Sequence, residues 1–521
     1  MNFLNRAWRY VTRKMSKSIL LGITFFMIGN LVLIGLGISD AAESAKTLTR
    51  KSMRAVVNYE VDYDKYYEYI NTLESDEEIN EAYKNYPSIK VDVVEEMAKD
   101  ERVKAVNFST ATIMYSNGFD NVPVGNEDKN NNSSSTYRDE FGNEVVYVNP
   151  NIMIQTNIFP NMIELEDGTY EVLEGRMYSQ EDIDNGNRVA LVTKELAELN
   201  GLKVGDTITL SNFQPSDMKM YMENNGLTED QVNMNLEIIG IYNTKNDVDP
   251  NSEQFDWMQP YESPKNFILL PHSTYAQFNY DMSLAMYNNA VANGQAENYG
   301  GEAPTIDSFM GASKAVFLLN DPLKVDQFVE DNTDKLIEYT KLNANNEQFK
   351  KLAKPLDTLS LFANVIVWIV TLNAVVIISL VTALTLKTRE FEIGVLLSLG
   401  VSKVKVVLQM FVELLIVAFL GFTLAVGTGS LIAGKVGDMV LDYQKNNTEE
   451  EITVDNSYQW AGDQNYFTEV TQDDILSQYH VTISVWIIIQ IYVMGIAVVF
   501  VSILVPSAMI MRLNPKQILL A

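Results

Sequence analysis

Four long apolar runs constrain this chain more than any other feature of its sequence. They occupy residues 18–38, 358–386, 406–434 and 481–511, and the first contains 21 residues without a charged side chain. At a rise of about 1.5 Å per residue, 21 helical residues extend about 31 Å, which is enough to cross a bilayer. The sequence therefore predicts four transmembrane helices.

The distribution of charge between these runs predicts their orientation. Residues 40–357 hold 55 acidic and 26 basic side chains, a difference of −29 that equals the net charge of the whole chain. Residues 1–17, 387–405 and 512–521 together hold 11 basic side chains and two acidic ones. Because cytoplasmic loops are enriched in Lys and Arg, we expect both termini and residues 387–405 in the cytoplasm. Residues 40–357, and the acidic loop 435–480, are then expected outside the cell.

The first run follows a basic segment, and two interpretations compete for it. Residues 1–17 carry five basic side chains and no acid, with Leu4, Trp8 and Val11 at helical spacing, which predicts an amphipathic interfacial helix. A cleaved signal peptide has an apolar core of only about 7–15 residues. The longer run observed here favours a retained signal-anchor.

The residue types present disfavour several kinds of chemistry. The chain has no cysteine, which excludes disulfides and thiolate metal ligands, and its two histidines, His272 and His480, lie far apart in the sequence. Residues 247–251 resemble the start of a calcium loop, but Pro250 and a missing glycine break that pattern. Nothing matches the phosphate-binding pattern G-x-x-x-x-G-K-[ST], so we expect no nucleotide hydrolysis by this chain. The acidic outer region also disfavours nucleic-acid binding.

Strand and helix patterns alternate at the two ends of the large outer region. In chain order they predict a strand at 55–63, a helix at 89–98, a strand at 103–115, a strand at 315–319 and a helix at 321–339. This order suits a split βαβ subdomain. Residues 145–270 are richer in strand patterns and predict an inserted module.

Helical patterns also connect this region to the membrane. The first span continues as a helix through Ala45 and Leu48, and residues 335–352 place Tyr339 and Leu342 on one side of a second helix. We expect these two stretches to pair as a stalk.

The segment between the second and third apolar runs is amphipathic. Phe391, Val395, Leu396 and Leu399 recur at helical spacing, and Gly400 ends the pattern. A short helix at the membrane surface is predicted. An interfacial connector without a partner and a docking element for a cytoplasmic protein both fit this pattern.

The same segment resembles a known family. Residues 389–402, REFEIGVLLSLGVS, match the R-x-x-E-I-G-x-L-x-x-L-G-x-S pattern of FtsX/MacB-type (type VII) ABC transporter permeases. Glu413 and Gly421 resemble the Glu and Gly of that family's next span, and Leu513-Asn514-Pro515 resembles its closing motif. The resemblance implies that residues 387–405 form a coupling helix that docks on a separate cytoplasmic ABC ATPase, which binds the ATP and Mg²⁺. The residues placed at that contact by the resemblance are Arg389, Glu390, Phe391, Glu392, Ile393, Gly394, Val395, Leu396, Leu399 and Gly400.

Two features of the third span invite a functional interpretation. Small residues recur every four positions, which lets helices approach closely, either inside the bundle or between two permeases. The residues of this small-residue stripe are Gly421, Ala425, Gly429 and Ala433. Glu413 lies about 10 Å inside the span. Ion coupling and simple snorkelling to the interface near Lys403 and Lys405 both remain open for this carboxylate.

These patterns and the resemblance together predict a multi-pass cell-membrane protein without enzymatic activity of its own. Its fold is expected to combine four transmembrane helices with a large extracytoplasmic α+β domain, a porter-like split βαβ with an inserted strand-rich module. The predicted segments are an interfacial helix 1–17, spans 18–38, 358–386, 406–434 and 481–511, an extracytoplasmic domain 39–357 with helical stalk ends, a coupling helix 387–405, an extracytoplasmic loop 435–480 and a cytoplasmic tail 512–521.

The function implied by the resemblance is that of a permease subunit working by mechanotransmission. ATP hydrolysis by the partner would drive extracytoplasmic motion that exports or extrudes a peptide, antibiotic or lipid-linked cargo. The expected partners are the ATPase, a second permease copy or paralogue, and membrane lipid. The alternative is an FtsX-like regulatory protein that switches an extracellular partner such as a cell-wall hydrolase.

Overall fold

The computed structural model describes residues 3–125, 134–138, 144–246, 248–252, 255–256, 258–296, 302–447, 466–468 and 471–512. It divides the chain into two compact units. The helical unit comprises Met1–Ser52, Glu347–Ile452 and Glu469–Ala521, and the α+β unit comprises Met53–Asn346 and Thr453–Thr468.

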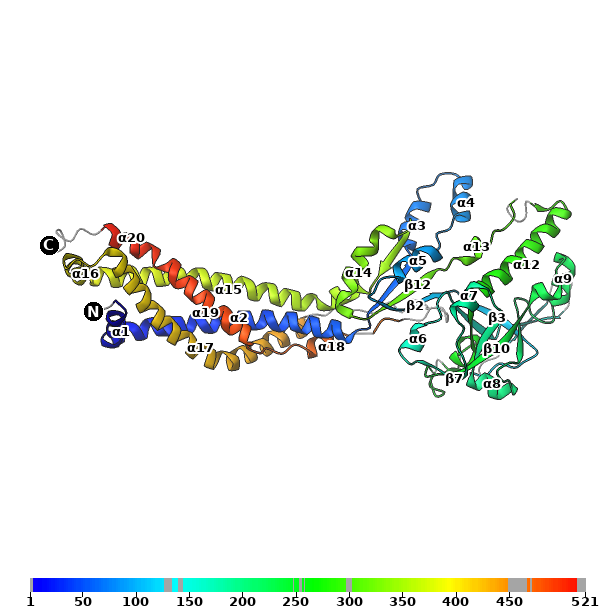
Figure 1. Ribbon diagram of the computed structural model, residues 1–521, viewed down its shortest axis with the longest axis horizontal. Helices are drawn as coiled ribbons and strands as arrows, with labels where there is room; N and C mark the ends of the chain where they lie inside the picture. The colour runs from blue at the N-terminus through cyan, green and yellow to red at the C-terminus, as the bar shows by residue number, and fades with distance from the viewer. Residues whose placement is uncertain are drawn as a thin grey trace. The chain divides into compact units, whose positions relative to one another are not determined.

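Four helices of the helical unit, within the described residues, are long and apolar enough to cross a membrane. They are α2 (Met15–Ser52), α15 (Asn346–Thr388), α17 (Lys403–Asn447) and α19 (Val485–Ser502), the last followed by α20 (Leu504–Arg512). These helices lie side by side in Figure 1. Their inner faces share one apolar core that includes Phe25, Phe422 and Ile491, whereas outward-facing side chains such as Trp368 and Leu372 are exposed.

The fourth span is broken between α19 and α20. Pro506 lies in the first turn of α20, and a proline ring clashes with the carbonyl four residues earlier in a continuous helix. That carbonyl belongs to Ser502, the last residue of α19. The break therefore has a local cause in the sequence.

Shorter helices complete the helical unit. They are α1 (Phe3–Arg13), α16 (Glu390–Ser398) and α18 (Gln472–Ser477).

The expected pairing of the two stalk helices is present, but the second helix begins later than predicted. Ala41 and Ala45 of α2 pack with Leu356 of α15, and Lys46 Nζ lies 2.6 Å from Asp357 Oδ1. The predicted helix over residues 335–352 is wrong in its first half. Residues Thr340–Asn343 form strand β13, which pairs with the neighbouring strand β1, and Tyr339 has a positive φ of 61° that interrupts any helix.

The first sheet of the α+β unit confirms the predicted split βαβ arrangement. Its strands are β1 (Val56–Val61), β2 (Val103–Ser109), β12 (Lys314–Leu319) and β13, in the order β13-β1-β12-β2. All neighbouring strands are antiparallel, so β1 and β2 run parallel with β12 between them. Helices α5 (Val91–Ala98) and α14 (Val325–Asn332) contribute Val94, Met97 and Phe328 to the core on one face of this sheet.

Two further helices follow β1 before α5. They are α3 (Tyr63–Ile70) and α4 (Asp76–Lys84), which stand out from the sheet in Figure 1. Tyr66, Ile70 and Ala82 join them in a small apolar cluster of their own.

The inserted module is built on a seven-stranded sheet with the order β7-β10-β8-β11-β6-β3-β9. Its strands are β3 (Ala111–Asn117), β6 (Ile152–Asn157), β7 (Tyr170–Gly175), β8 (Val189–Thr193), β9 (Thr207–Ser211), β10 (Asn233–Thr244) and β11 (Phe267–Pro271). Because β9 pairs with both β3 and β10, six of the strands close on themselves. Strands β6, β8 and β11 are buried along their whole length, which explains the apolar runs in β8 and β11, whereas the second half of β6 buries Gln155, Thr156 and Asn157.

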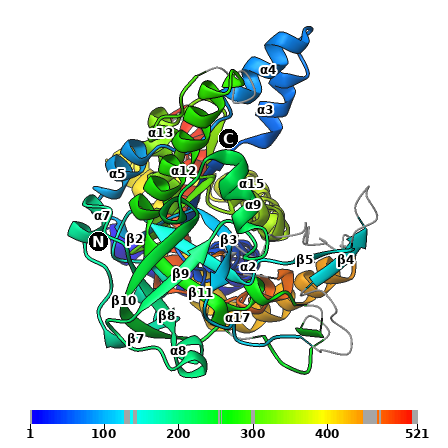
Figure 2. The ribbon, with the colours of Figure 1, turned by 90° about the vertical axis from the view of Figure 1, so that its right-hand side faces the viewer.

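Helices surround this closed sheet, with α8 and α12 on different sides of it (Figures 1 and 2). Among the described residues, the other α-helices and strands of the α+β unit are α6 (Ile163–Glu166), α7 (Gln180–Asp184), α8 (Lys194–Asn200), α9 (Met218–Asn225), α10 (Glu229–Val232), α12 (His272–Ala292), α13 (Asp307–Met310), β4 (Ser134–Arg138) and β5 (Glu144–Val148).

Candidate functional site

The amphipathic segment between the second and third spans forms the short helix α16. Arg389 occupies its N-cap position, and Gly400 follows its C-terminal end with a φ of 81°. This left-handed conformation favours glycine, and it lets the amide of Val401 donate to the carbonyl of Leu396 at 3.1 Å. The helix therefore covers nine residues of the predicted 387–405 segment, and Lys403 and Lys405 already belong to α17.

One face of α16 carries an exposed apolar stripe. Phe391 and Leu399 are 65% and 76% exposed, and Val395 lies between them at the same helical spacing. On the other side Ile393 is buried in the core of the helical unit, and Gly394 is buried as well. We call Phe391, Val395 and Leu399 the exposed stripe. The sequence placed Leu396 with them, but this side chain is half-buried.

Arg389 links the start of α16 to two other helices. Its guanidinium donates to Glu413 Oε2 of α17 at 2.8 Å, and its central carbon lies 3.6 Å from the centre of the Tyr10 ring of α1. Gln409, one turn before Glu413, donates to Glu413 Oε1 at 2.9 Å. We call Tyr10, Arg389, Gln409 and Glu413 the Arg389 cluster. The side chains of Arg389 and Glu413 are only 11% and 9% exposed, so this ion pair is largely removed from solvent.

The surroundings of Glu413 differ from what its sequence neighbours suggest. Lys403, one of the two lysines near the interface, donates instead to the carbonyl of Met511 at 2.7 Å. The partner of Glu413 is Arg389, a residue of the same motif. The carboxylate of Glu413 is thus paired with a cation inside the bundle and does not rely on Lys403 at the interface.

The small-residue stripe of the third span lies against the first span of the same chain. A Cβ added at Gly421 would stand 2.7 Å from Phe25 Cβ, and one at Gly429 would stand 2.7 Å from Leu33 Cδ1. A Cβ added at Gly29 of α2 would stand 2.8 Å from Ala425 Cβ, and Ala433 is fully buried. Of the two contacts considered for this stripe, the structure contains the one inside the bundle.

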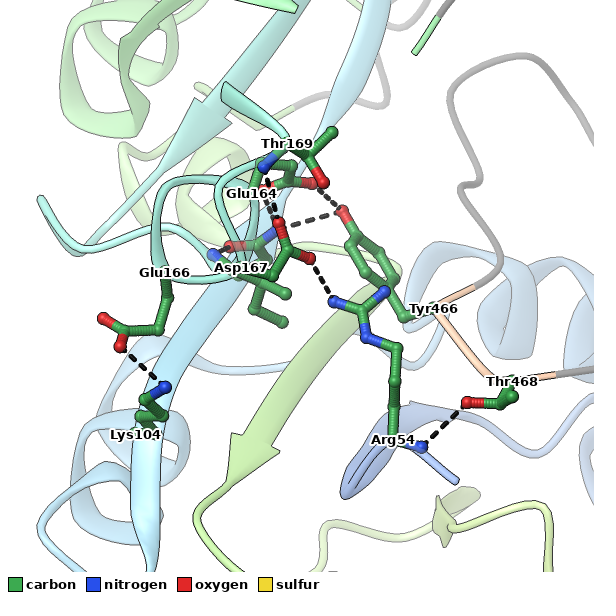
Figure 3. A network of polar contacts seen from close by, with 10 residues as sticks. Arg54, Lys104, Glu164, Glu166, Asp167, Thr169, Tyr466 and Thr468 are labelled. Carbon is green, nitrogen blue, oxygen red and sulfur yellow. Dashed lines mark hydrogen bonds and ion pairs between the residues drawn. The ribbon is translucent and has the colours of Figure 1, made fainter. Parts of the chain in front are cut away.

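A second polar cluster lies within the α+β unit and includes residues from the loop between the third and fourth spans. Tyr466 donates to Glu164 Oε1 at 2.5 Å, and Asn107 of β2 donates to Glu164 Oε2 at 2.8 Å. Figure 3 shows the Tyr466 hydroxyl directed at Glu164. The Tyr466 ring packs on the face of the first sheet opposite α5 and α14, beside Val316 and Leu318.

Contacts on either side of Tyr466 fix the same segment. Arg54, just before β1, donates through its backbone amide to Thr468 Oγ1 at 2.8 Å, and its guanidinium lies 2.5 Å from Asp167 Oδ2 (Figure 3). Glu166 pairs nearby with Lys104 at 2.8 Å. Residues 466–468, which the sequence assigns to a separate loop, are thus part of the α+β unit. We call Asn107, Glu164 and Tyr466 the Glu164 latch.

Comparisons with known protein families identify both halves of the chain. Residues 364–515 match the FtsX-like permease C-terminal model. Residues 21–299, more than half of the chain, match the MacB-like periplasmic core domain model. This chain belongs to the FtsX/MacB-type family of ABC transporter permeases. The permease is accordingly a multi-pass membrane protein whose α+β unit is an extracellular domain, and the family implies an ATPase partner.

The chain is also similar to individual proteins. The permease is 26% identical over 535 residues to the uncharacterized ABC transporter permease YclI of Bacillus subtilis (strain 168), covering 100% of this chain and 99% of that one. The extracellular domain of the noncanonic ABC-type transporter YknZ from Gram-positive bacteria is 11% identical, with a TM-score of 0.26, covering 55% of this chain and 98% of that domain. The periplasmic region of MacB from Actinobacillus actinomycetemcomitans is 8% identical, with a TM-score of 0.27, covering 56% and 90%.

Several residues of these clusters were not identified from the sequence. Gln409 lies four residues before Glu413, so helical spacing could have indicated it. Tyr10 and the Glu164 latch gave no such signal, because Glu164 and Tyr466 are 302 positions apart. The closing motif Leu513-Asn514-Pro515 lies outside the described residues.

The buried carboxyl of Glu164 predicts a measurable pH dependence. Burial raises the pKa of Glu164, although the hydrogen bonds from Tyr466 and Asn107 oppose this. A carboxyl whose pKa is higher in the folded state stabilises the fold below its unfolded pKa of about 4.3, and this contribution disappears as the pH rises through the folded pKa. We expect the melting temperature of the wild type, relative to Glu164→Gln, to fall as the pH rises above about 4.3.

The matched control for this measurement is Glu166→Gln. The pKa of Glu166 is lowered, chiefly by its hydrogen bond with Lys104, so its contribution is present above the unfolded pKa and is lost as the pH falls. Thermal unfolding of the purified proteins at a series of pH values measures the melting temperature of the wild type minus that of each variant. With rising pH this difference should fall for Glu164→Gln and rise for Glu166→Gln. Equal slopes would contradict the buried environment of Glu164.

Proposed function

We propose that this permease converts ATP hydrolysis by a cytoplasmic partner ATPase into motion of its extracellular domain. The partner binds α16, the N- and C-termini lie in the cytoplasm, and two permease chains act together. The motion extrudes or exports a peptide, antibiotic or lipid-linked cargo from the outer face of the membrane.

The observation that carries this proposal is the connection between the spans and the first sheet. Helix α2 runs without a break from the first span to Ser52, and only three residues separate it from β1. Two residues separate β13 from α15, which runs without a break through the second span to Thr388. Because β1 and β13 are adjacent antiparallel strands, both helices attach at the same end of one hydrogen-bonded strand pair. In this proposal a displacement of the two helices reaches the sheet through these two short chain connections.

The exposed stripe and the Arg389 cluster support a cytoplasmic entry point for the force. The exposed stripe presents large apolar side chains on a helix whose other face is buried in the bundle. Exposed apolar patches of this kind favour a protein partner. The Arg389 cluster connects α16 to α17 and α1, so a displacement of α16 acts on more than its covalent neighbours.

The proposal is tested by following the stalk during ATP hydrolysis. Leu48 is about half exposed near the end of α2 and can carry a spin label after Leu48→Cys in this cysteine-free chain. We expect the distance between the labels of two chains, in a complex with an ABC ATPase that co-purifies with this chain, to change when ATP is added. A hydrolysis-deficient ATPase should hold the distance in one state. An unchanged distribution with active ATPase would contradict the proposal.

The same complexes separate transport from regulation. Loss of export or of drug resistance with an inactive ATPase supports the transport function. A cell-division or wall-lysis defect would instead support the regulatory alternative.

A further inference from the structure

A group of tyrosines gathers around helix α3 of the extracellular domain, with Tyr86 just after α4 and Tyr339 just before β13. Tyr66 is at its centre, and its ring centre lies 5.8 Å from that of Tyr67, 5.2 Å from that of Tyr86 and 5.6 Å from that of Tyr339. Tyr63 stacks on Tyr67 with ring centres 6.4 Å apart. We call Tyr63, Tyr66, Tyr67, Tyr69, Tyr86 and Tyr339 the tyrosine patch.

Most of the tyrosine patch faces solvent. Tyr63, Tyr67, Tyr69 and Tyr86 are 44%, 48%, 38% and 41% exposed, which leaves a large aromatic surface uncovered even though some of the rings stack on one another. Tyrosine is enriched at the energetically important positions of protein interfaces, because its ring offers a large contact area with little conformational freedom to lose. An uncovered group of this size therefore indicates an interaction surface.

The tyrosine patch is held rigidly. Tyr66 is buried and donates its hydroxyl hydrogen to the carbonyl of Ala82 at 3.0 Å, which ties α3 to α4. Tyr339 stacks on Tyr69 with ring centres 5.2 Å apart and adopts a positive φ of 61°, a conformation that costs energy for a residue with a side chain. Its carbonyl accepts from the amide of Asp62 at 2.8 Å. A preorganised surface loses less entropy on binding than a mobile one.

The charge around the tyrosine patch is strongly negative. Residues 62–86 contain eight acidic side chains and two lysines. Asp64, Glu68 and Glu81 are exposed on the same two helices, whereas Lys65 pairs with Asp62 at 3.4 Å. This surface repels anionic polymers and lipid headgroups and attracts cations. Tyrosine faces also bind guanidinium groups by cation–π interaction.

We propose that the tyrosine patch binds an arginine-rich segment of a peptide or protein outside the cell. The guanidinium groups stack on Tyr63, Tyr67 and Tyr69 while the surrounding carboxylates provide the long-range attraction. Arginine is preferred to lysine because its planar group stacks on aromatic rings and is more weakly hydrated. Binding of such a segment does not depend on the proposed function. Only the identification of this ligand as the cargo or client of the permease rests on that function.

The binding test uses the full chain in detergent, without ATP and without the ATPase. Fluorescence anisotropy with labelled nona-arginine gives the affinity, and nona-lysine and chitotetraose serve as comparison ligands. We expect nona-arginine to bind more tightly than nona-lysine. The double variant Tyr63→Ala with Tyr67→Ala should bind it about tenfold more weakly, because two stacking contacts are lost. The double variant Glu68→Gln with Glu81→Gln should reduce the dependence of affinity on salt.

A matched control separates the tyrosine patch from tyrosines in general. Tyr221 of α9 is 38% exposed, like Tyr69, and stacks on Phe213 with ring centres 4.4 Å apart, but it lies in the inserted module. Tyr221→Ala should leave nona-arginine affinity unchanged. All of these variants keep the buried Tyr66, so we expect them to remain folded. Thermal unfolding of each variant checks this.

Three outcomes would overturn the proposal. The first is that nona-arginine does not bind. The second is that the wild type and the double variant Tyr63→Ala with Tyr67→Ala bind nona-arginine with equal affinity. The third is that chitotetraose binds and nona-arginine does not. None of these depends on ATP, so they differ from a failure of the proposed function, which appears as an unchanged stalk distance.

Discussion

Replacing both Phe391 and Leu399 by aspartate is expected to release the partner ATPase from this permease. The two side chains are 65% and 76% exposed on one face of α16, so the change leaves the core of the helical unit intact. Central apolar side chains of an interface commonly contribute about 2 kcal/mol or more each, and a charge in their place adds a desolvation cost. We expect the affinity for the ATPase to fall roughly 100- to 1,000-fold. Co-purification of the two subunits and ATPase stimulation by the permease measure this effect.

The matched control is Leu199→Asp. Leu199 is 50% exposed at the end of α8, so it undergoes the same apolar-to-charged change on the extracellular domain. This variant should retain the ATPase fully. If the aspartate pair in α16 co-purified with ATPase as well as Leu199→Asp does, the exposed stripe could not be the docking surface.

The second large effect is expected from Arg389→Ala. The substitution leaves the carboxylate of Glu413 buried without its 2.8 Å partner, and breaking a buried ion pair from one side costs about 3–5 kcal/mol. We expect the melting temperature of the purified chain to fall by roughly 10 °C. Arg389→Lys should recover only part of this loss, because an ammonium group cannot both stack on Tyr10 and make the forked contact to Glu413.

A double replacement distinguishes loss of the ion pair from loss of a side chain. When both members of a buried pair are exchanged for apolar residues of similar volume, stability is often retained. Arg389→Met with Glu413→Leu should therefore melt within a few degrees of the wild type. If this double variant were no more stable than Arg389→Ala, the unpaired charge would not be the cause of the loss.

The spans were predictable because their main determinant is local. A run of about 20 apolar residues is stable in a bilayer only as a helix, whatever the rest of the chain does. The C-terminal end of α16 was predictable for a similar reason, because Gly400 favours the left-handed conformation that follows it, whereas the predicted segment 387–405 was longer than the helix Glu390–Ser398. The order of strands and helices in the first sheet also followed from local patterns, with β13 as the exception.

The error over residues 335–352 shows where local patterns fail. Tyr339 and Leu342 have helical spacing, yet Thr340–Asn343 gain more from pairing with β1, which lies about 280 positions earlier in the chain. The tyrosine patch had the same origin, since Tyr339 reaches α3 only because β13 lies beside β1. Spacing along the chain carries no information about such a partner.

Local sequence is enough to predict the number of membrane spans, the acidic character of the outer domain and the motif that forms α16, because each depends on residues close together in the chain. Which side chains meet depends on the folded chain: Arg389 contacts Glu413 and Tyr10, and Glu164 contacts Tyr466. The energy of these contacts comes from burying charged and polar groups between elements distant in sequence. Such burial exists only after the chain has folded.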